Sequence, residues 1–358
     1  MNVAILLGRQ DIPSDGVEDY SCSLAEALSE LGHSVQLFRV PWHSMGFWGA
    51  IKQLPSELSS SPRDWILMQF THLMWSRRGF SLIAIAVAKL ARRSGSRVAV
   101  TMHDPVAFPG GRRRDAVRRW IQNLIMKELV RTADHVFVTL PPDALPWLKH
   151  SSLATLTYVP VGSNIPPSTV EQSAWGENQV FTIAVFGVGS GRREIEEIAE
   201  VTRAVAEELG ALAVVLLGRG SSEAAPVFRK LIGESAISLL VKGLAPVEDI
   251  SSCLNRADAL LFLRGEVSTR RGTAIAAIAH GLPVVGYRGR DTRWPITEAG
   301  LILGSVGDTT CLTKGLIELA QDPSLRGSLR DRNRVAYANY FSWDRIGATV
   351  EESLLCHQ

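Results

Sequence analysis

The sequence has little cysteine and no long hydrophobic run. Its four cysteines are scattered, without the CxxC spacing of zinc sites or the pattern of a disulfide framework. Lys89 interrupts the longest apolar stretch, so no segment reaches the roughly 20 apolar residues that a membrane helix needs. The apolar N-terminus has neither a basic leader nor a small-residue cleavage site. These absences argue against a secreted disulfide-rich protein and an integral membrane protein, and we expect a cytoplasmic protein.

The sequence also lacks an excess of charge of one sign. Its 38 Lys and Arg residues nearly balance 36 Asp and Glu residues, which leaves a formal net charge of +2. Such a balance does not indicate a nucleic-acid partner. With 46% hydrophobic and 21% charged residues, the 358-residue chain has the composition of a soluble globular protein and enough length for two domains.

Apolar runs of strand length alternate with helix-period segments through most of the chain, as in NVAILLG, RVAVTMH, FTIAVFG and ADALLFL. Near-continuous apolar strands predict parallel sheets with helices on both faces. The pattern weakens where Pro, Ser, Gly and Asn cluster, so we predict a linker at 166–178. We therefore expect an α/β protein with two doubly wound, Rossmann-like domains, 1–165 and 179–340, that face each other across a cleft. A C-terminal helix, 341–358, is expected to pack on the first domain.

Residues that follow strands are the candidates for function, because open α/β sheets bind ligands beyond the carboxyl ends of their strands. In the first domain, Gly16 permits a tight turn before a helix whose predicted cap is Asp19 or Ser21. His103 and Asp104 end another strand, where a histidine can hydrogen-bond a sugar hydroxyl or carry a proton. An ordinary capped turn, and a polar pair that stops a strand before Pro105, explain the same residues without a function.

The second domain opens on a glycine-rich loop between a strand and a helix, VFGVGSGRREIEEI. Backbone amides, the helix dipole and the guanidinium groups of Arg192 and Arg193 together suit a phosphate. The loop glycines, Gly187, Gly189 and Gly191, form GxGxG rather than the complete GxGxxG, and no acidic residue follows at the dinucleotide spacing. A nicotinamide site is therefore poorly supported, and the plain alternative is a pair of solvated arginines.

A second cationic turn, LRGEVSTRRGT, also leads from a strand into a helix. It offers cations, hydroxyl donors and a glycine at the helix start, namely Arg264, Ser268, Thr269, Arg270, Arg271, Gly272 and Thr273. Because both cationic loops leave strand ends of one domain, we expect them to converge on a diphosphate. The alternative has Arg270 and Arg271 exposed beside a helix that is simply buried.

The segment 112–131 is basic and carries apolar residues at helical spacing, namely Trp120, Ile121, Leu124, Ile125 and Leu129. This pattern occurs in helices that lie on anionic membranes, which would make the protein peripheral at the inner face of the membrane. More often such a stripe faces the core while the basic side is solvated, and that interpretation is favoured here.

The ordered set of motifs resembles glycosyltransferase family 4, whose members have the GT-B fold and a retaining mechanism. The similar stretches cover nearly the whole chain and run in the family's order: GVEDYSCSLAEALSELGHSV, VTMHD, VPVGSNIP, IAVFGVGSGRREI, VVLLGRG, VKGLAPVEDISSCLNRADALLFL and AIAAIAHGLPVV. The resemblance implies transfer of a hexose-type sugar from a nucleotide-diphosphate donor to a hydroxyl acceptor, which is a glycan, a lipid-linked sugar or a small molecule. It implies neither a metal nor a cofactor beside the nucleotide-sugar co-substrate.

The resemblance also implies roles for the candidate residues. The donor diphosphate would bind the basic loops of the second domain, and His103 would contact the donor sugar. The catalytic candidates are His103, Arg192, Arg193, Arg270 and Arg271. The donor-binding candidates are Gly187, Gly189, Gly191, Arg264, Glu266, Ser268, Thr269, Gly272 and Thr273. The acceptor-side candidates are Gly16, Asp19, Tyr20 and Asp104.

Three positions depart from the family pattern. Two glutamates that the family places eight residues apart across the donor turn and helix are replaced by Ser268 and Ala276. The family's arginine after the first donor-domain strand is replaced by Val188, which leaves Arg193 as the basic partner. A lost charge-assisted pair corresponds to roughly 1.5–3 kcal/mol of binding.

These departures lead to a specific expectation and an alternative. We expect Arg270 and Arg271 to restore the missing positive charge and Glu266 to hold the ribose. The alternative hypothesis is a catalytically silent GT-B protein that acts as a partner or regulator of a transferase. A sugar-nucleotide epimerase is less favoured, because its acid–base chemistry needs several carboxylates that the sequence does not place.

Overall fold

The computed structural model describes residues 1–8, 16–58, 63–108, 110–145, 147–148, 156–167, 180–189 and 191–356. The chain forms two compact units. Unit 1 comprises Met1–Val161 and Trp343–Gln358, and unit 2 comprises Gly162–Ser342. Residues 168–178 of the predicted linker lie outside the described part of the chain.

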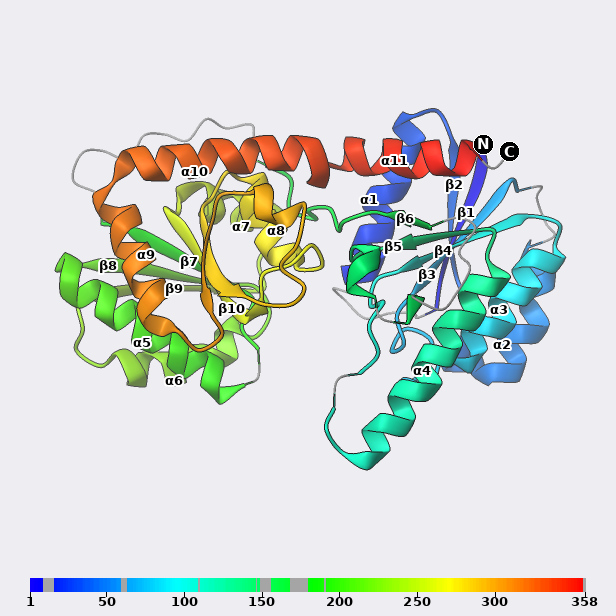
Figure 1. Cartoon of the computed structure of the whole chain (residues 1–358), viewed down its shortest axis with the longest axis horizontal. Helices are drawn as coiled ribbons and strands as arrows, with labels where there is room; N and C mark the ends of the chain where they lie inside the picture. Colours follow the sequence, from blue (N-terminus) through cyan, green and yellow to red (C-terminus); the bar gives the residue numbers. More distant parts are fainter. Residues whose placement is uncertain are drawn as a thin grey trace. The chain divides into compact units, whose positions relative to one another are not determined.

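Unit 1 contains a sheet of six parallel strands in the order β2-β1-β3-β4-β5-β6 (Figure 1). The strands are β1 (Asn2–Leu7), β2 (Ser34–Arg39), β3 (Trp65–Phe70), β4 (Arg97–Met102), β5 (His135–Val138) and β6 (Leu156–Tyr158). One face is covered by α2 (Trp42–Leu58), α3 (Leu82–Arg93) and α4 (Arg113–Thr132), and the other by α1 (Gly16–Glu30) and α11 (Trp343–Leu355). The short helix η1 (Pro142–Ala144) follows β5. Burial of both faces explains why the central strands are continuously apolar.

Helix α11 packs against α1, as expected for the C-terminal helix. The helices approach closely at Gly347, where an added Cβ would lie 3.0 Å from Cβ of Ala27. His33, just after α1, joins α11 to the start of the chain. Its Nδ1 lies 3.1 Å from the amino group of Met1, and its Nε2 lies 2.7 Å from Oε1 of Glu351.

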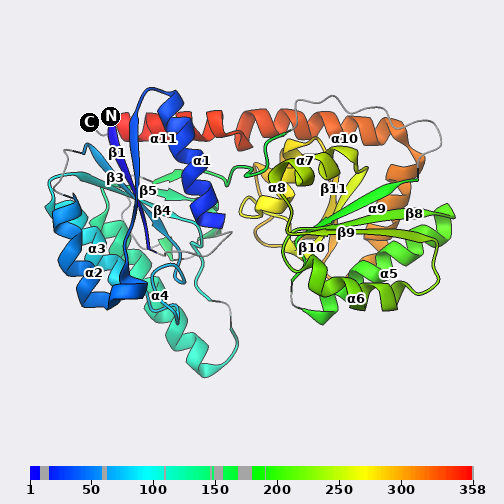
Figure 2. The same cartoon turned by 180° about the vertical axis from the view of Figure 1, so that it is seen from behind.

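Unit 2 contains a second sheet of six parallel strands, in the order β12-β11-β10-β7-β8-β9. The strands are β7 (Thr182–Phe186), β8 (Leu212–Leu217), β9 (Ile237–Gly243), β10 (Ala259–Glu266), β11 (Val284–Arg288) and β12 (Leu301–Ser305). One face carries α5 (Arg192–Leu209), α6 (Ser221–Ile232) and α9 (Thr309–Gln321), and the other carries α7 (Val247–Arg256) and α8 (Gly272–Ala279), as Figure 1 and Figure 2 show. Helix α10 (Pro323–Ala336) packs on α8 and α9, and the short helices η3 (Ile296–Glu298) and η4 (Tyr337–Phe341) complete the unit.

The sequence of α8 matches its position. Its residues GTAIAAIA include no charged side chain, and Ala274 to Ala279 are all buried. A helix that is apolar on every side is stable only where the protein surrounds it. Among the described residues, no helix is both long enough and apolar enough to cross a bilayer.

We predict that replacing Gly347 with Val destabilises the protein, because the new side chain would collide with Ala27 and push α11 away from α1. The expected loss in the free energy of unfolding is about 1–3 kcal/mol. Urea denaturation measures it. The matched control is Gly327→Ala in α10, where an added Cβ meets nothing within 4 Å. This control should gain about 0.5–1 kcal/mol, since alanine favours a helix. Equal stability of the Gly347→Val variant and the wild type would contradict the packing described here.

Candidate functional site

The strand order of unit 2 contains a topological switch point. The chain runs from β7 outward to β8 and β9, then crosses back so that β10 lies on the other side of β7. The connections after β7 and β10 therefore leave in opposite directions, and open α/β sheets bind ligands at such points. The two loops are still close together here. A methyl group built on Gly187 would lie 3.5 Å from Nη1 of Arg264 and 3.8 Å from Cγ2 of Thr273.

Backbone contacts join the loops after β7 and β8. The amide of Val188 donates to the carbonyl oxygen of Arg219 at 3.0 Å, and the amide of Gly187 donates to that of Leu217 at 2.7 Å. Gly220 has a φ of +81°, and a Cβ there would lie 2.0 Å from the carbonyl oxygen of Val188. Only glycine fits this close approach. The local sequence therefore fixes the point at which Arg219 leaves the backbone.

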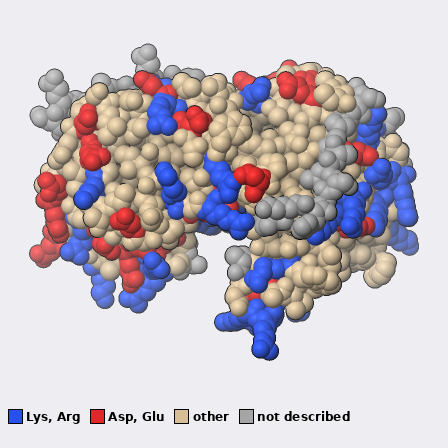
Figure 3. Space-filling model, in the orientation of Figure 1, with Lys and Arg blue, Asp and Glu red and all other residues tan. Residues whose placement is uncertain are grey.

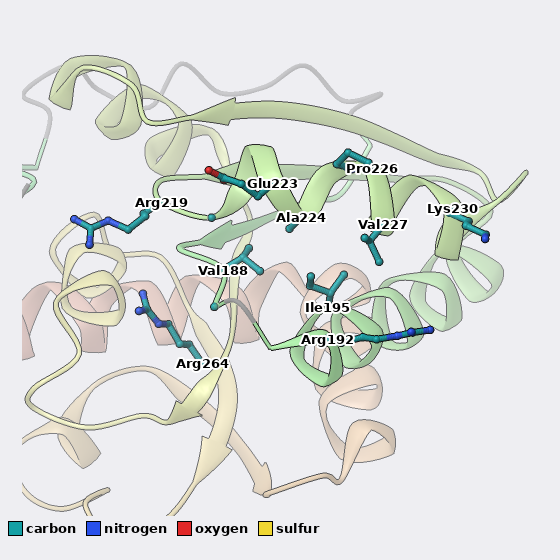
Figure 4. A pocket seen from close by; sticks show the side chains of 12 residues that line it. Val188, Arg192, Ile195, Arg219, Glu223, Ala224, Pro226, Val227, Lys230 and Arg264 are labelled. Carbon is teal, nitrogen blue, oxygen red and sulfur yellow. The ribbon is translucent and has the colours of Figure 1, made fainter. Parts of the chain in front are cut away.

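A pocket of about 920 Å³ lies beside these loops, between α5 and α6 (Figure 4). Its middle is lined by apolar side chains, namely Val188, Ile195, Ala224, Pro226 and Val227. Arg219 and Arg264 point to one end of it, and Arg192 and Lys230 lie at the other. Among its lining residues, these four cations face a single carboxylate, that of Glu223. The pocket is therefore suited to an anion.

The side chain of Glu194, in the first turn of α5, hydrogen-bonds to the glycine loop that precedes this helix. Its two carboxylate oxygens each lie 3.1 Å from the amide nitrogen of Gly189. Partial burial raises the pKa of Glu194, although the Gly189 amide and the positive charges of Arg264 and Arg271 oppose the rise. The protein's own carboxylate thus lies among the amide and cationic groups that the sequence predicts for a phosphate.

Two of the predicted donor residues interact with the loop after β11. Nη2 of Arg270 lies 2.6 Å from Oδ2 of Asp291, and both side chains are largely buried. Oε2 of Glu266 accepts a hydrogen bond from the amide of Asp291 at 3.1 Å. The hydroxyl of Thr292 donates to the carbonyl oxygen of Val267 at 2.7 Å. In this structure the charge of Arg270 is therefore compensated by Asp291, and the carboxylate of Glu266 is hydrogen-bonded to the loop after β11.

The turn before α8 is largely buried. Ser268 and Thr269 are almost inaccessible, and the hydroxyl of Ser268 has no hydrogen-bond partner among the described residues. Arg271 is at the N-cap position of α8, and Gly272 and Thr273 are the first residues of the helix. A Cβ built on Gly187 would lie 3.8 Å from Cγ2 of Thr273, so the structure brings this turn and the glycine loop together.

Arg192 and Arg193 begin α5, just after Gly191 at its N-cap, and extend into solvent. Their side chains are 85% and 77% exposed, and each pairs with a glutamate one turn later, Glu196 and Glu197, at 2.7 Å. Arg192 lines the pocket, whereas Arg193 is absent from its lining. The guanidinium groups of Arg192 and Arg193 are therefore paired with carboxylates of α5 itself in this structure.

In unit 1, His103 belongs to a buried cluster at the end of β4. Its Nε2 lies 2.7 Å from Oε1 of Gln69, and its ring meets Tyr20 edge-on, with 4.7 Å between ring centroids. Tyr20 also packs edge-on against Trp343 at 5.0 Å. Burial lowers the pKa of His103 to about 3 and raises the pKa of Tyr20. The imidazole is therefore neutral at physiological pH, with Nε2 donating to Gln69 and Nδ1 as the acceptor.

The remaining acceptor-side candidates lie near this cluster in the chain. Gly16 is the first residue of α1 and has open space around it. Asp19 lies within the first turn of α1, because the helix begins at Gly16, so the prediction that it caps the helix is wrong. Its side chain is exposed, as is that of Asp104, which directly follows His103. The loop that precedes α1, residues 9–15, is outside the described part of the chain.

Three residues of these sites were missing from the sequence-based candidates. Gln69 could have been identified as the single polar residue in the strand sequence WILMQF. Arg219 could have been identified from its place in the strand-to-helix turn LLGRGSS. Glu194 had none, because a glutamate in the first turn of a helix is ordinary there. Only the folded loop shows that its carboxylate binds the Gly189 amide.

Comparison with known proteins gives structural matches only. No protein-family model matches the sequence, and neither does any curated protein. The sucrose-phosphate synthase of Thermosynechococcus elongatus is 16% identical, with a TM-score of 0.72 over 100% of both chains. HepE of Anabaena, in a complex with UDP and glucose, is 15% identical, with a TM-score of 0.67 over 99% of this chain and 100% of its own. A putative UDP-N-acetylglucosamine 2-epimerase from Listeria monocytogenes is 11% identical, with a TM-score of 0.63 over 99% and 96%.

At these identities the comparisons establish the fold. The chain has the GT-B fold, with two parallel six-stranded Rossmann-like sheets, and this prediction is confirmed. Structures described as a synthase, as glycosyltransferases and as a putative epimerase share this fold. The reaction must therefore be argued from the site itself.

The buried His103 predicts a specific pH dependence of stability. Its pKa falls from the ordinary 6.5 to about 3 on folding, so between these pH values the unfolded chain binds a proton that the folded chain does not. The free energy of unfolding should then decrease as the pH drops through this window, by up to about 1.4 kcal/mol per pH unit from this residue. Urea midpoints across the window, compared between wild type and His103→Gln, isolate this contribution. The exposed His43→Gln variant is the control. Identical pH profiles for wild type and His103→Gln would show that His103 is not buried as a neutral ring.

Proposed function

We propose that this protein is a retaining, metal-independent glycosyltransferase of the family 4 type that uses a nucleotide-diphosphate sugar. The observation that carries the proposal is the cationic pocket at the switch point of unit 2, with Arg219 and Arg264 beside a glycine loop and the start of α5. Structures of HepE with UDP and of MnaA with UDP show that proteins of this fold bind such nucleotides. The acceptor is a hydroxyl of a glycan, a lipid-linked sugar or a small molecule.

The chemistry of transfer assigns a role to the cations. The reaction breaks the bond between the anomeric carbon of the sugar and a diphosphate oxygen, so negative charge accumulates on the departing diphosphate. Fixed cations and amide dipoles lower the energy of that charge in the transition state. We assign this role first to Arg219, Arg264 and Arg271, together with the amides at the start of α5 and α8. Arg192, Arg193 and Arg270 stay in the proposal as residues that would have to leave their present carboxylate partners.

His103 is proposed to contact the sugar as a hydrogen-bonding group. A neutral imidazole whose Nε2 donates to Gln69 presents Nδ1 as an acceptor, which suits a sugar hydroxyl. A pKa of about 3 makes it a poor general acid at physiological pH. Gly16, Asp19, Tyr20 and Asp104 remain the proposed acceptor-side residues, with Tyr20 acting through its packing against His103.

A catalytically silent GT-B protein is the second candidate. Ala276 is buried and offers no group to a ribose, and Glu194 already binds the Gly189 amide. Both features are expected of a site that no longer binds a nucleotide-sugar donor. Hydrolysis of nucleotide sugars in the absence of an acceptor discriminates between the candidates, because many transferases slowly hydrolyse their donor and a silent protein would not.

We predict that replacing Arg219 and Arg264 with Gln weakens donor binding by roughly 10- to 100-fold each, the usual effect of losing a hydrogen bond to a charged group. Isothermal titration calorimetry with UDP, GDP and ADP in parallel measures the affinity. Arg203→Gln, an exposed change near the far end of α5, is the control. If one of these nucleotides binds wild type and both variants alike, the two arginines are not the diphosphate site.

Replacing Glu194 with Gln should have the opposite effect. The change keeps the size of the side chain but removes a negative charge that competes with the diphosphate for the Gly189 amide and for Arg264 and Arg271. We expect the affinity for the best nucleotide to rise about tenfold, or about 1.4 kcal/mol. The same titrations measure it, with Glu207→Gln on α5 as control. A weaker affinity in Glu194→Gln would mean that the carboxylate supports the loop for binding and does not compete.

A further inference from the structure

Helix α4 presents an apolar stripe to solvent. Val117, Trp120 and Leu124 lie on one side of the helix, with 58%, 64% and 44% of each residue exposed. The buried residues Ile125 and Leu129 lie on the other side, against the core of unit 1. The apolar stripe predicted for this segment is therefore divided between core and surface.

Arginines surround the exposed stripe. Between residues 112 and 127 the sequence has five arginines and one lysine but a single acidic residue, Asp115. The carboxylate of Asp115 accepts a hydrogen bond from the amide of Arg112 at the helix start. Figure 1 shows the N-terminal end of α4 projecting beyond the strands of its own unit, and Figure 3 shows Lys and Arg side chains gathered over that end. Arg113 and Arg114 are both exposed there.

The projecting end of α4 is held in place by neighbouring loops. The buried amide of Gln122 bonds two of them: its Oε1 accepts from the amide of Phe108 at 2.8 Å, and its Nε2 donates to the carbonyl oxygen of Gly79 at 3.0 Å. The guanidinium of Arg118 lies 4.4 Å from the ring centroid of Phe108. The exposed stripe is therefore a fixed surface feature of unit 1, with the part-exposed Phe80 and Phe108 beside it.

We propose that this α4 surface, Val117, Trp120 and Leu124 with Arg113 and Arg114, docks on an anionic phospholipid bilayer. A tryptophan flanked by aliphatic side chains and arginines is the composition that partitions into the lipid headgroup region. The positive charge of the surface complements anionic lipid. A second copy of the chain fits less well, since an isologous contact would bring the arginines of both copies together. The surface binds lipid whether or not the proposed transfer reaction occurs, so the two proposals fail separately.

Vesicle flotation of the full-length protein tests the proposal. Wild type should float with vesicles of mixed phosphatidylcholine and phosphatidylglycerol and stay unbound with phosphatidylcholine alone, and added salt should weaken the binding. The double variant Arg113→Gln/Arg114→Gln should bind about 25-fold more weakly, from roughly a fivefold effect of each arginine. The triple variant Val117→Ser/Trp120→Ser/Leu124→Ser should bind the mixed vesicles at least about tenfold more weakly than wild type. All five positions are exposed, and urea denaturation checks that the variants fold.

Two control variants keep the test specific. Trp48→Ser removes a 79% exposed tryptophan of α2, and Arg203→Gln/Arg229→Gln removes two exposed arginines of unit 2. Both should bind the mixed vesicles as wild type does.

The proposal is overturned if wild type does not bind them, if the triple variant binds like wild type, or if Trp48→Ser lowers binding as much as the triple variant. It is also overturned if wild type is a dimer in solution that the triple variant dissociates.

Discussion

Parallel pairing of β7 with β10 on one side and β8 on the other is the constraint on which the candidate site of unit 2 depends. The pairing sends the following loops in opposite directions, which leaves backbone amides and helix starts at one sheet edge. Close backbone contacts then fix the side chains at this edge. Gly220 touches the carbonyl of Val188, and Gly187 lies beside Arg264. The cationic character of the pocket follows from these contacts, because Arg219 and Arg264 leave the backbone at fixed points around it.

Glu194 gives this site its particular chemistry. The carboxylate of Glu194 hydrogen-bonds to the amide of Gly189, and its negative charge offsets part of the positive charge of Arg264 and Arg271 before any ligand binds. A bound diphosphate would have to displace the Glu194 carboxylate. Its binding free energy would then be only the difference between its own interactions with the site and those that Glu194 gives up. The same arrangement accounts for a weakly binding transferase and for a silent relative, and it makes Glu194 the residue on which the distinction depends.

The fold was predictable from sequence because the central strands are mostly continuous apolar runs bounded by glycine or polar residues, as in VAILL and LAVVLL. The loops that carry candidate residues were predictable for the same reason, since they follow strands. Side-chain partners were not. Local sequence gives no sign that Arg270 pairs with Asp291, because the loop after β11 meets this turn only in the folded unit. Likewise, Trp120 and Ile125 belong to one predicted stripe, but their opposite positions on α4 separate surface from core.

A crystal structure of the protein with the nucleoside diphosphate that it binds best is the most direct test of the central claim. The account predicts diphosphate density at the switch point of unit 2, with oxygens bonded to the guanidinium groups of Arg219 and Arg264 and to the Gly189 amide. The carboxylate of Glu194 should have moved off that amide. Density at another strand end, or a diphosphate that touches neither arginine, would contradict the account.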